Sequence, residues 1–190
     1  TWSSDARDIA YVSFENNRAQ VFLHNLATGK RESILATGST VSSPAWSPDK
    51  SKIAFSSTMD GNSEIYLLDL RSKRINRLTD NKAIDTEPAW SPDGKKILFT
   101  SDRSGSPQIY EINPINLVKR RITTVGNYNA RPSYINKQKI IFVHRDTESF
   151  QIASLDLRTR ELEILTSTKN DESPCIAPNG NVIIYSTKEG

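Results

Sequence analysis

The sequence predicts an all-β fold, a β-propeller built from four-stranded blades of about 44 residues. A hexapeptide, Pro-Ala-Trp-Ser-Pro-Asp, occurs at residues 44–49 and again at 88–93, 44 residues later. Two further series of residues repeat with the same period. Val, Ile, Phe, Tyr and Thr dominate the repeating segments, and prolines stand where the helices of a helical repeat would have to run. The repeat is therefore one of strands and turns.

The two further series lock the register of the repeat. The aromatic series is Tyr11, Phe55, Phe99, Phe142 and Tyr185, with spacings of 44, 44, 43 and 43. The other series opens an apolar run at Gln20, Glu64, Gln108 and Gln151. Three independent series that share one period indicate a genuine internal repeat, and not a chance similarity.

Residues 88–131 illustrate the elements of one unit. Strands are expected at residues 88–90, 96–100, 108–112 and 120–123. The first turn contains Asp93 and Gly94, a pair that readily supplies the positive φ angles of a tight hairpin. The second turn is expected at residues 102–105. Four strands in about 44 residues match the blade period of a propeller.

The whole chain, residues 1–190, is interpreted as one partial propeller. The expected blades cover about residues 2–45, 46–89, 90–133 and 134–175, and the first half of a fifth begins at 176. That fifth unit contains a turn at residues 178–180 and a second strand at 182–186. An uncovered blade face of several hundred Å² would forfeit roughly 10 kcal/mol of apolar burial. We therefore expect a piece of a larger propeller, or a ring completed by association.

Composition excludes several classes of function. The chain is 36% hydrophobic and 25% charged, and no apolar stretch approaches the roughly 20 residues that a membrane span needs. The first residues do not resemble a signal peptide. A single cysteine, Cys175, excludes an internal disulfide and a multi-cysteine zinc site.

Neither His24 nor His144 has the spacing of a metal ligand, and no G-x-S-x-G nucleophile motif occurs. We therefore expect no cofactor, no metal and no catalytic residues.

Basic residues recur at the hairpin that leads into the outermost strand of each unit. They are Lys30, Arg31, Lys73, Arg74, Lys119, Arg120, Arg121, Arg158 and Arg160. Acidic residues are interleaved with them, and the net charge is only +3. Charged side chains on an outer edge strand discourage pairing between molecules. This pattern does not predict a nucleic-acid partner.

The turns that precede the repeated prolines differ from unit to unit, whereas the core positions repeat. These turns cover residues 40–43, 84–87, 128–131 and 170–173. In a propeller they lie around the mouth of the central channel. Varied polar and aromatic side chains on a rigid scaffold could form a binding surface. The turns could equally vary because nothing constrains their sequence. The residues alone do not decide between a binding surface and unconstrained loops.

Several segments resemble the propeller of the TolB family. They are residues 78–80, 85–94 and 99–110, and in the last unit residues 171–174, 177–180 and 182–186. The Pro-Asp-Gly motif is shared with many propellers, including those that cap serine peptidases. The late segments are more particular to TolB proteins, and the resemblance covers essentially the whole chain.

The resemblance implies a six-bladed, non-enzymatic, periplasmic scaffold, of which this chain is an incomplete part. TolB proteins receive the lipoprotein Pal at the channel mouth, in a system that supports outer-membrane integrity and cell division. Bacteriocin segments that imitate Pal would use the same face. Binding of TolA is not expected, since the N-terminal segment that engages TolA has no counterpart here. The candidate Pal-binding residues are Thr40, Ser43, Thr86, Glu87, Tyr128, Arg131, Asp171 and Glu172.

The alternative is the gating propeller of a prolyl-oligopeptidase-like serine hydrolase. In such a protein the blades only restrict access, and catalysis takes place on an α/β-hydrolase domain. A nucleophile motif in a domain after the last blade would distinguish this alternative from a TolB-type scaffold.

Overall fold

A computed structural model describes residues 1–177 and 181–188, which form seventeen β-strands and contain no helix. The first sheet contains β1 (Asp8–Glu15), β2 (Arg18–Asn25) and β3 (Arg31–Ala36). The second contains β4 (Val41–Trp46), β5 (Lys52–Ser57), β6 (Glu64–Asp69) and β7 (Ile75–Arg77), and the third contains β8 (Asp85–Trp90), β9 (Ile97–Ser101), β10 (Gln108–Ile112) and β11 (Lys119–Arg121). The fourth contains β12 (Tyr128–Tyr134), β13 (Lys139–Arg145), β14 (Gln151–Asp156) and β15 (Leu162–Ile164), and the fifth contains β16 (Glu172–Ile176) and β17 (Ile183–Ser186). Strands that follow one another in a sheet pair antiparallel.

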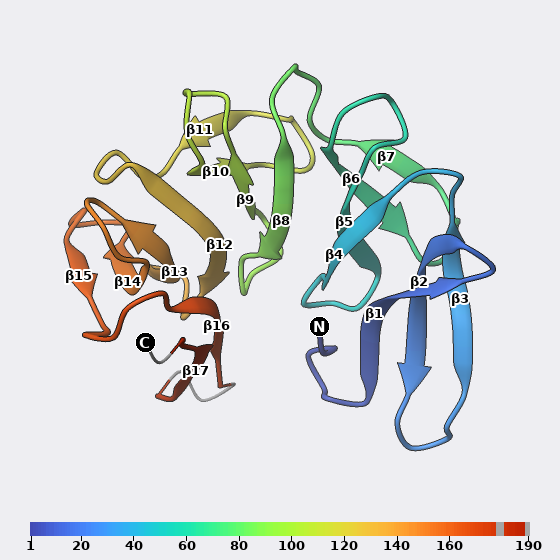
Figure 1. The fold of residues 1–190 in the computed structure, drawn as a ribbon. Helices are drawn as coiled ribbons and strands as arrows, with labels where there is room; N and C mark the ends of the chain where they lie inside the picture. The colour runs from blue at the N-terminus through green and yellow to red at the C-terminus, as the bar shows by residue number, and fades with distance from the viewer. Residues whose placement is uncertain (178–180, 189–190) are drawn as a thin grey trace.

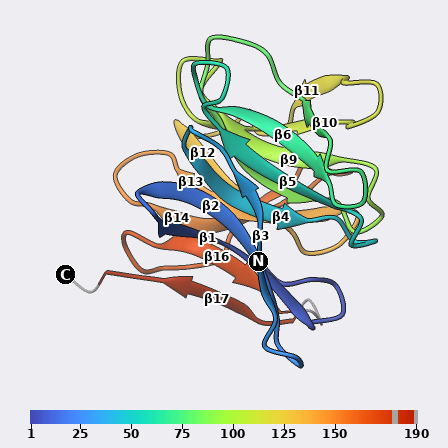
Figure 2. The ribbon, with the colours of Figure 1, turned by 90° about the vertical axis from the view of Figure 1, so that its right-hand side faces the viewer.

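The five sheets are arranged as an arc around a central axis, with β4, β8, β12 and β16 on the inner side (Figure 1). Each of these inner strands contacts the next one, β4 with β8, β8 with β12 and β12 with β16. Seen from the side, the strands of the first sheet lie in front and overlap those of the sheets behind them (Figure 2). In the first sheet Trp2 forms an isolated bridge to Ile9, in the position that the inner strand takes elsewhere. The prediction of an all-β propeller with four-stranded blades is confirmed.

The inner strands begin earlier than the repeated motif suggested. We expected the first strand of the third sheet at residues 88–90, whereas β8 begins at Asp85. Pairing with the neighbouring strand continues past an irregularity in register, so residues before the proline belong to the same sheet as the tryptophan after it. The expected divisions after residues 45, 89, 133 and 175 therefore fall inside inner strands. The expected turn at residues 178–180 lies outside the described residues.

The core lies between neighbouring sheets and contains the periodic aromatic residues. Phe55, Phe99 and Phe142 are completely buried. Phe99 packs with Ile97, Tyr110 and residues of the preceding sheet in one apolar cluster. The rings of Phe99 and Tyr110 have centroids 5.9 Å apart, and Phe55 and Tyr66 repeat this pair at 5.7 Å. The aromatic series therefore marks the packing of one blade on the next.

The Ser-Pro-Asp turns have the same structural role in the second and third sheets. Ser47 donates a hydrogen bond of 2.6 Å from Oγ to Oδ1 of Asp49, and its Oγ accepts one of 2.9 Å from the backbone N–H of Lys52. Ser91 binds Asp93 and the N–H of Lys96 in the same way. The hydrogen bond from Ser47 lowers the pKa of Asp49 to about 2. The aspartates of this motif thus serve the turn.

A threonine after the outer strand ties the connection between sheets back to the third strand. Oγ1 of Thr79 accepts the N–H of Ile65 at 2.9 Å, and Thr123 accepts that of Ile109 at the same distance. In the second sheet this tie includes Glu64, whose side chain is completely buried. Carboxylate oxygens of Glu64 accept hydrogen bonds from the hydroxyl of Thr79, from Nη2 of Arg77 at 3.0 Å and from the N–H of Asn81 at 2.7 Å.

Candidate functional site at the central channel

Each inner strand from β4 onward contains a bulge at the repeated proline. Two residues of the inner strand stand opposite one residue of the second strand, because pairing shifts between Ser42 and Ala45 and, in the third sheet, between Thr86 and Ala89. The single residue opposite each bulge is a member of the aromatic series: Phe55, Phe99, Phe142 and Tyr185. The bulge and the aromatic residue opposite it therefore recur together in each of these four sheets.

The residue before each of these prolines has a left-handed backbone. The φ angles are 50° for Ser43, 57° for Glu87, 54° for Arg131 and 55° for Ser173. Residues other than glycine enter this region at a cost of order 1–3 kcal/mol, and a following proline ordinarily favours extended backbone. The surrounding sheet holds this conformation four times in succession. The result is that one side chain per blade is turned out of the pleat.

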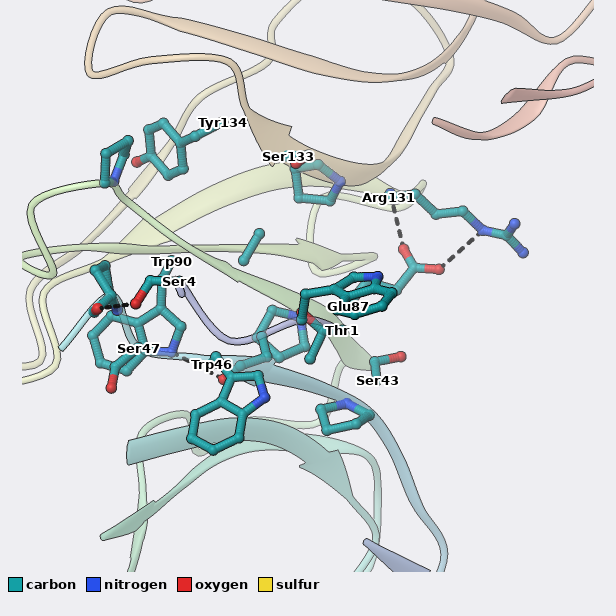
Figure 3. A pocket seen from close by; sticks show the side chains of 18 of the residues that line it. Thr1, Ser4, Ser43, Trp46, Ser47, Glu87, Trp90, Arg131, Ser133 and Tyr134 are labelled. Carbon is teal, nitrogen blue, oxygen red and sulfur yellow. Dashed lines mark hydrogen bonds and ion pairs between the residues drawn. The ribbon is translucent and has the colours of Figure 1, made fainter. Parts of the chain in front are cut away.

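These turned-out side chains line an open cavity of about 670 Å³ on the channel axis (Figure 3). All four belong to its wall, together with Pro44, Pro88, Pro132 and Pro174, and with Trp46 and Trp90. Trp90 donates from Nε1 to the carbonyl of Ala45 in the neighbouring sheet at 3.2 Å. The cavity thus combines proline and tryptophan surfaces with four polar side chains of three kinds, two serines, a glutamate and an arginine.

Arg131 joins three sheets across this wall. Its Nε donates to Oε1 of Glu87 at 3.3 Å, and its Nη1 lies 3.4 Å from Oε2 of Glu172. Nη1 also donates to the hydroxyl of Ser173. Figure 3 shows the guanidinium of Arg131 beside the carboxylate of Glu87. The side chain of Arg131 is 42% exposed, so this charged group is accessible to a ligand in the channel.

In the third and fourth sheets the bulged residue also ties its blade to the preceding one through the backbone. The N–H of Glu87 donates to Oγ of Ser56 on β5 at 3.2 Å. The N–H of Arg131 is shared between Oε2 of Glu87 at 2.9 Å and Oγ1 of Thr100 on β9 at 3.1 Å, and the hydroxyl of Thr100 donates to Glu87 at 2.8 Å. Because the bulge removes these N–H groups from their own sheet, they become available to the neighbouring blade. The channel wall is therefore fixed by hydrogen bonds between sheets.

The predicted site residues divide into two groups. Ser43, Glu87 and Arg131 lie on the wall of the cavity, and Glu172 contacts Arg131. Thr40 and Thr86 lie nearby at the start of the inner strands, outside the cavity wall. Thr40 is exposed, and Thr86 is half-buried and accepts a hydrogen bond of 3.3 Å from Ser56.

Tyr128 and Asp171 occupy more enclosed positions. Tyr128 packs edge-on against Phe150 with ring centroids 5.1 Å apart, and burial raises the pKa of its hydroxyl. Asp171 corrects our expectation, because its side chain is completely buried and bonded to the hydroxyl of Thr168. Desolvation raises its pKa, yet hydrogen bonds from threonine hydroxyls outweigh this and hold the pKa below its usual range. Asp171 is therefore buried and does not belong to the lining of the cavity.

Sequence reasoning overlooked Ser173, which lies on this wall, and the buried Ser56 and Thr100, which form hydrogen bonds to its residues. Ser56 and Thr100 lie one residue after the periodic aromatics Phe55 and Phe99. Ser173 stands before a repeated proline, as Glu87 and Arg131 do. The position before the proline was the signal that could have identified it.

The remaining sequence expectations concern histidines, cysteine, metals and the membrane. His144 is buried at the end of β13, and His24 lies half-buried in β2. Cys175 is a free, exposed thiol. In residues 1–177 and 181–188 no three histidine, cysteine or acidic residues are grouped so that they could hold a metal ion. The same part of the chain has no helix of the length and hydropathy that crossing a membrane requires.

Known proteins with related sequences and structures share this architecture. The TolB β-propeller domain family matches residues 1–190. The Tol-Pal system protein TolB of Xylella fastidiosa (strain Temecula1) is 55% identical over 192 residues, which cover 100% of this chain and 44% of that protein. TolB of Pseudomonas aeruginosa is 46% identical over 68 residues, or 34% of this chain and 16% of that protein. The chain thus spans less than half the length of these relatives.

Solved structures point to the same family. The crystal structure of TolB from Acinetobacter baumannii superimposes with a TM-score of 0.92 and 43% sequence identity, covering 100% of this chain and 48% of that one. A puromycin-hydrolysing peptidase of Mycobacterium tuberculosis has a TM-score of 0.71 at 14% identity, over 87% of this chain and 28% of that one. At such low identity the peptidase shares only the fold. The family match over every residue and the identity over the whole chain agree, and the chain belongs to the TolB β-propeller family.

Proposed function

We propose that this chain is the Pal-docking part of a non-enzymatic, periplasmic scaffold of the Tol–Pal system, which supports outer-membrane integrity and cell division. The observation that carries the proposal is the 55% identity, over the whole chain, to a protein named Tol-Pal system protein TolB. The accessible wall of Ser43, Glu87, Arg131 and Ser173 supports it, because these positions carry hydroxyl, carboxylate and guanidinium groups while their backbone is held in one repeated conformation. A surface fixed in this way can receive a partner with little rearrangement.

The same wall suggests how docking would work. Arg131 presents a partly exposed guanidinium between Glu87 and Glu172, so the wall offers charges of both signs. The prolines and tryptophans beneath offer rigid apolar surface that loses little conformational freedom on binding. Bacteriocin segments that imitate Pal would use this same surface. The residues proposed as contacts are Thr40, Ser43, Thr86, Glu87, Tyr128, Arg131 and Glu172.

A calorimetric titration of the soluble domain of Pal into the intact protein tests the proposal. We expect saturable binding with a one-to-one stoichiometry. No heat and no complex at high micromolar concentration would contradict it, and would leave the gating propeller of a serine hydrolase as the function to test next.

Thr86→Arg tests where Pal docks. We expect it to weaken Pal binding about tenfold or more, because a long cation would stand where the partner packs. Thermal stability should change little, because Thr86 is only half-buried and an arginine can extend to solvent. Thr159→Arg is the matched control, on the exposed hairpin at the opposite ends of the strands, and should bind Pal like the parent. Unchanged affinity of Thr86→Arg would remove this strand from the docking surface.

A further inference from the structure

A second cavity, of about 430 Å³, opens at the outer part of the fourth sheet, away from the channel wall. Its lining comes from the end of β13, the turn before β14, the outer strand β15 and the connections around it. His144, Asp146, Gln151 and Ile164 belong to this lining, and Lys169 lies on it as well. No part of the proposed Pal site uses these residues.

The second and third sheets carry arginine at the corresponding place. The third residue of the outer strand is Arg77 in β7 and Arg121 in β11, but Ile164 in β15. Arg77 donates from Nε to the carbonyl of Thr79 at 2.8 Å, and Arg121 donates to that of Thr123 at 2.6 Å. In the fourth sheet Nε2 of Gln151 takes over this bond, to the carbonyl of Thr166 at 2.9 Å.

A second arginine is also replaced. Strand pairing aligns Asp85 with Ser101 in the third sheet and Asn129 with His144 in the fourth. Two residues beyond Ser101 stands Arg103, which contacts Asp85 at 2.6 Å and Ser101 at 2.8 Å. Two residues beyond His144 stands Asp146. The fourth sheet therefore lacks both guanidinium groups, and an acid occupies one of their positions.

The hydrogen bond that His144 forms through Nδ1 leaves its Nε2 as an acceptor at this cavity. Asn129 donates from Nδ2 to the carbonyl of Val125 and to Oε1 of Gln108, both at 2.9 Å, so its Oδ1 is the atom that faces His144. Nδ1 of His144 must then donate to Oδ1, at 2.8 Å. Desolvation lowers the pKa of His144, against a weaker opposing effect of Asp146, so the ring is neutral and Nε2 carries a lone pair. The side chain is only 4% exposed, and Nε2 has no hydrogen-bond partner among residues 1–177 and 181–188.

Two further acceptors share this lining without a donor. Oε1 of Gln151 and the carboxylate of Asp146 accept no hydrogen bond within the described part of the chain. Lys169 forms no ion pair with Asp146 in that part of the chain. A cavity lined by a carboxylate and two further acceptors suits a ligand that brings several N–H donors and a positive charge. A guanidinium group has five donors in one plane and is always charged.

We propose that this cavity receives the guanidinium group of an arginine side chain from a bound polypeptide. Asp146 supplies the charge, and Nε2 of His144 and Oε1 of Gln151 accept N–H groups, as Asp85 and Ser101 do for Arg103 inside the chain. The apolar residues Leu162 and Ile164 provide a wall for the aliphatic part of the side chain. The proposal is independent of the identity of the partner in the channel.

Nuclear magnetic resonance of the intact protein, with its histidine side chains labelled and assigned, tests the proposal. The probe is N-acetyl-arginine amide, and N-acetyl-citrulline amide is its uncharged counterpart. We expect a saturable shift of the His144 imidazole signals with the arginine probe, no shift of His24, and binding about tenfold weaker with citrulline. A linear shift that is equal for both probes, or no shift, would overturn the proposal.

Two substitutions of one residue provide the matched variants. Ile164→Arg places in β15 the residue that β7 and β11 carry, so the chain's own guanidinium should fill the cavity and abolish binding of the probe. Ile164→Leu keeps the cavity apolar and should bind like the parent. Ile164 is 42% exposed, so both variants should fold, which a backbone amide spectrum checks. Undiminished binding by Ile164→Arg would contradict the assignment of this cavity.

Discussion

Replacing Phe99 with alanine is expected to lower the free energy of unfolding by about 3–5 kcal/mol. The ring is completely buried in the cluster that joins the second and third sheets, and it packs against Tyr110 with centroids 5.9 Å apart. Its residue is also the one that stands opposite the bulge at Glu87 and Pro88. The substitution would therefore leave a cavity between two blades directly behind the channel wall. Equilibrium unfolding in urea measures the effect.

The control for Phe99→Ala is Phe14→Ala. Phe14 is 77% exposed near the end of β1, so its removal should change the stability of the described chain by about 0.5 kcal/mol or less. A loss below about 1 kcal/mol for Phe99→Ala would mean that the aromatic series does not form the core between blades.

Replacing Glu64 with alanine is expected to lower the free energy of unfolding by about 3–5 kcal/mol, because it leaves Arg77 and three further donors without their buried acceptor. The carboxylate is completely buried and accepts hydrogen bonds from Thr79, from Arg77, and from both the backbone N–H and the side-chain amide of Asn81. These bonds hold the connection that leads from β7 to the inner strand β8. The loss should appear as a lower midpoint in urea unfolding with the same slope.

Glu64→Gln is the matched variant, because the third sheet already carries Gln108 at this place. Oε1 of Gln108 accepts the hydroxyl of Thr123 at 2.8 Å, as Glu64 accepts that of Thr79. We therefore expect Glu64→Gln to retain more than half of the stability that Glu64→Ala loses. Equal losses for the two variants would show that the stabilisation depends on the charge of Glu64 and not on its hydrogen bonds.

The parts of the fold that the sequence predicted are those in which one residue type does the same work in every blade. The aromatics at the core and the Ser-Asp turns recur because burial and turn geometry select the same side chains each time. Phe55, Phe99 and Phe142, and the turns at Ser47 and Ser91, are found where the repeat placed them. The start of each inner strand was missed because the bulge interrupts the regular pairing at the proline.

The site was harder to predict because varied residues can be either exposed or buried. Val41, Asp85, Asn129 and Asp171 occupy one repeat position, and all are buried. Each polar member bonds to a partner of its own, Arg103 for Asp85, Gln108 for Asn129 and Thr168 for Asp171, so residue and partner vary together. The sequence variation at this position therefore resembled that of an exposed binding surface, although the residues are buried. The contacts of Arg131 join residues more than 40 positions apart, which no local pattern reveals.

Because of the bulges, hydrogen exchange at two backbone amides depends on contact between blades. In a regular strand, protection of an amide reports on fraying of its own sheet. The N–H groups of Glu87 and Arg131 instead bind Ser56 and Thr100 of the preceding sheet. Their exchange with solvent deuterium therefore follows the separation of two blades, even where each sheet stays intact. These two positions act as built-in reporters of motion between blades at the channel wall.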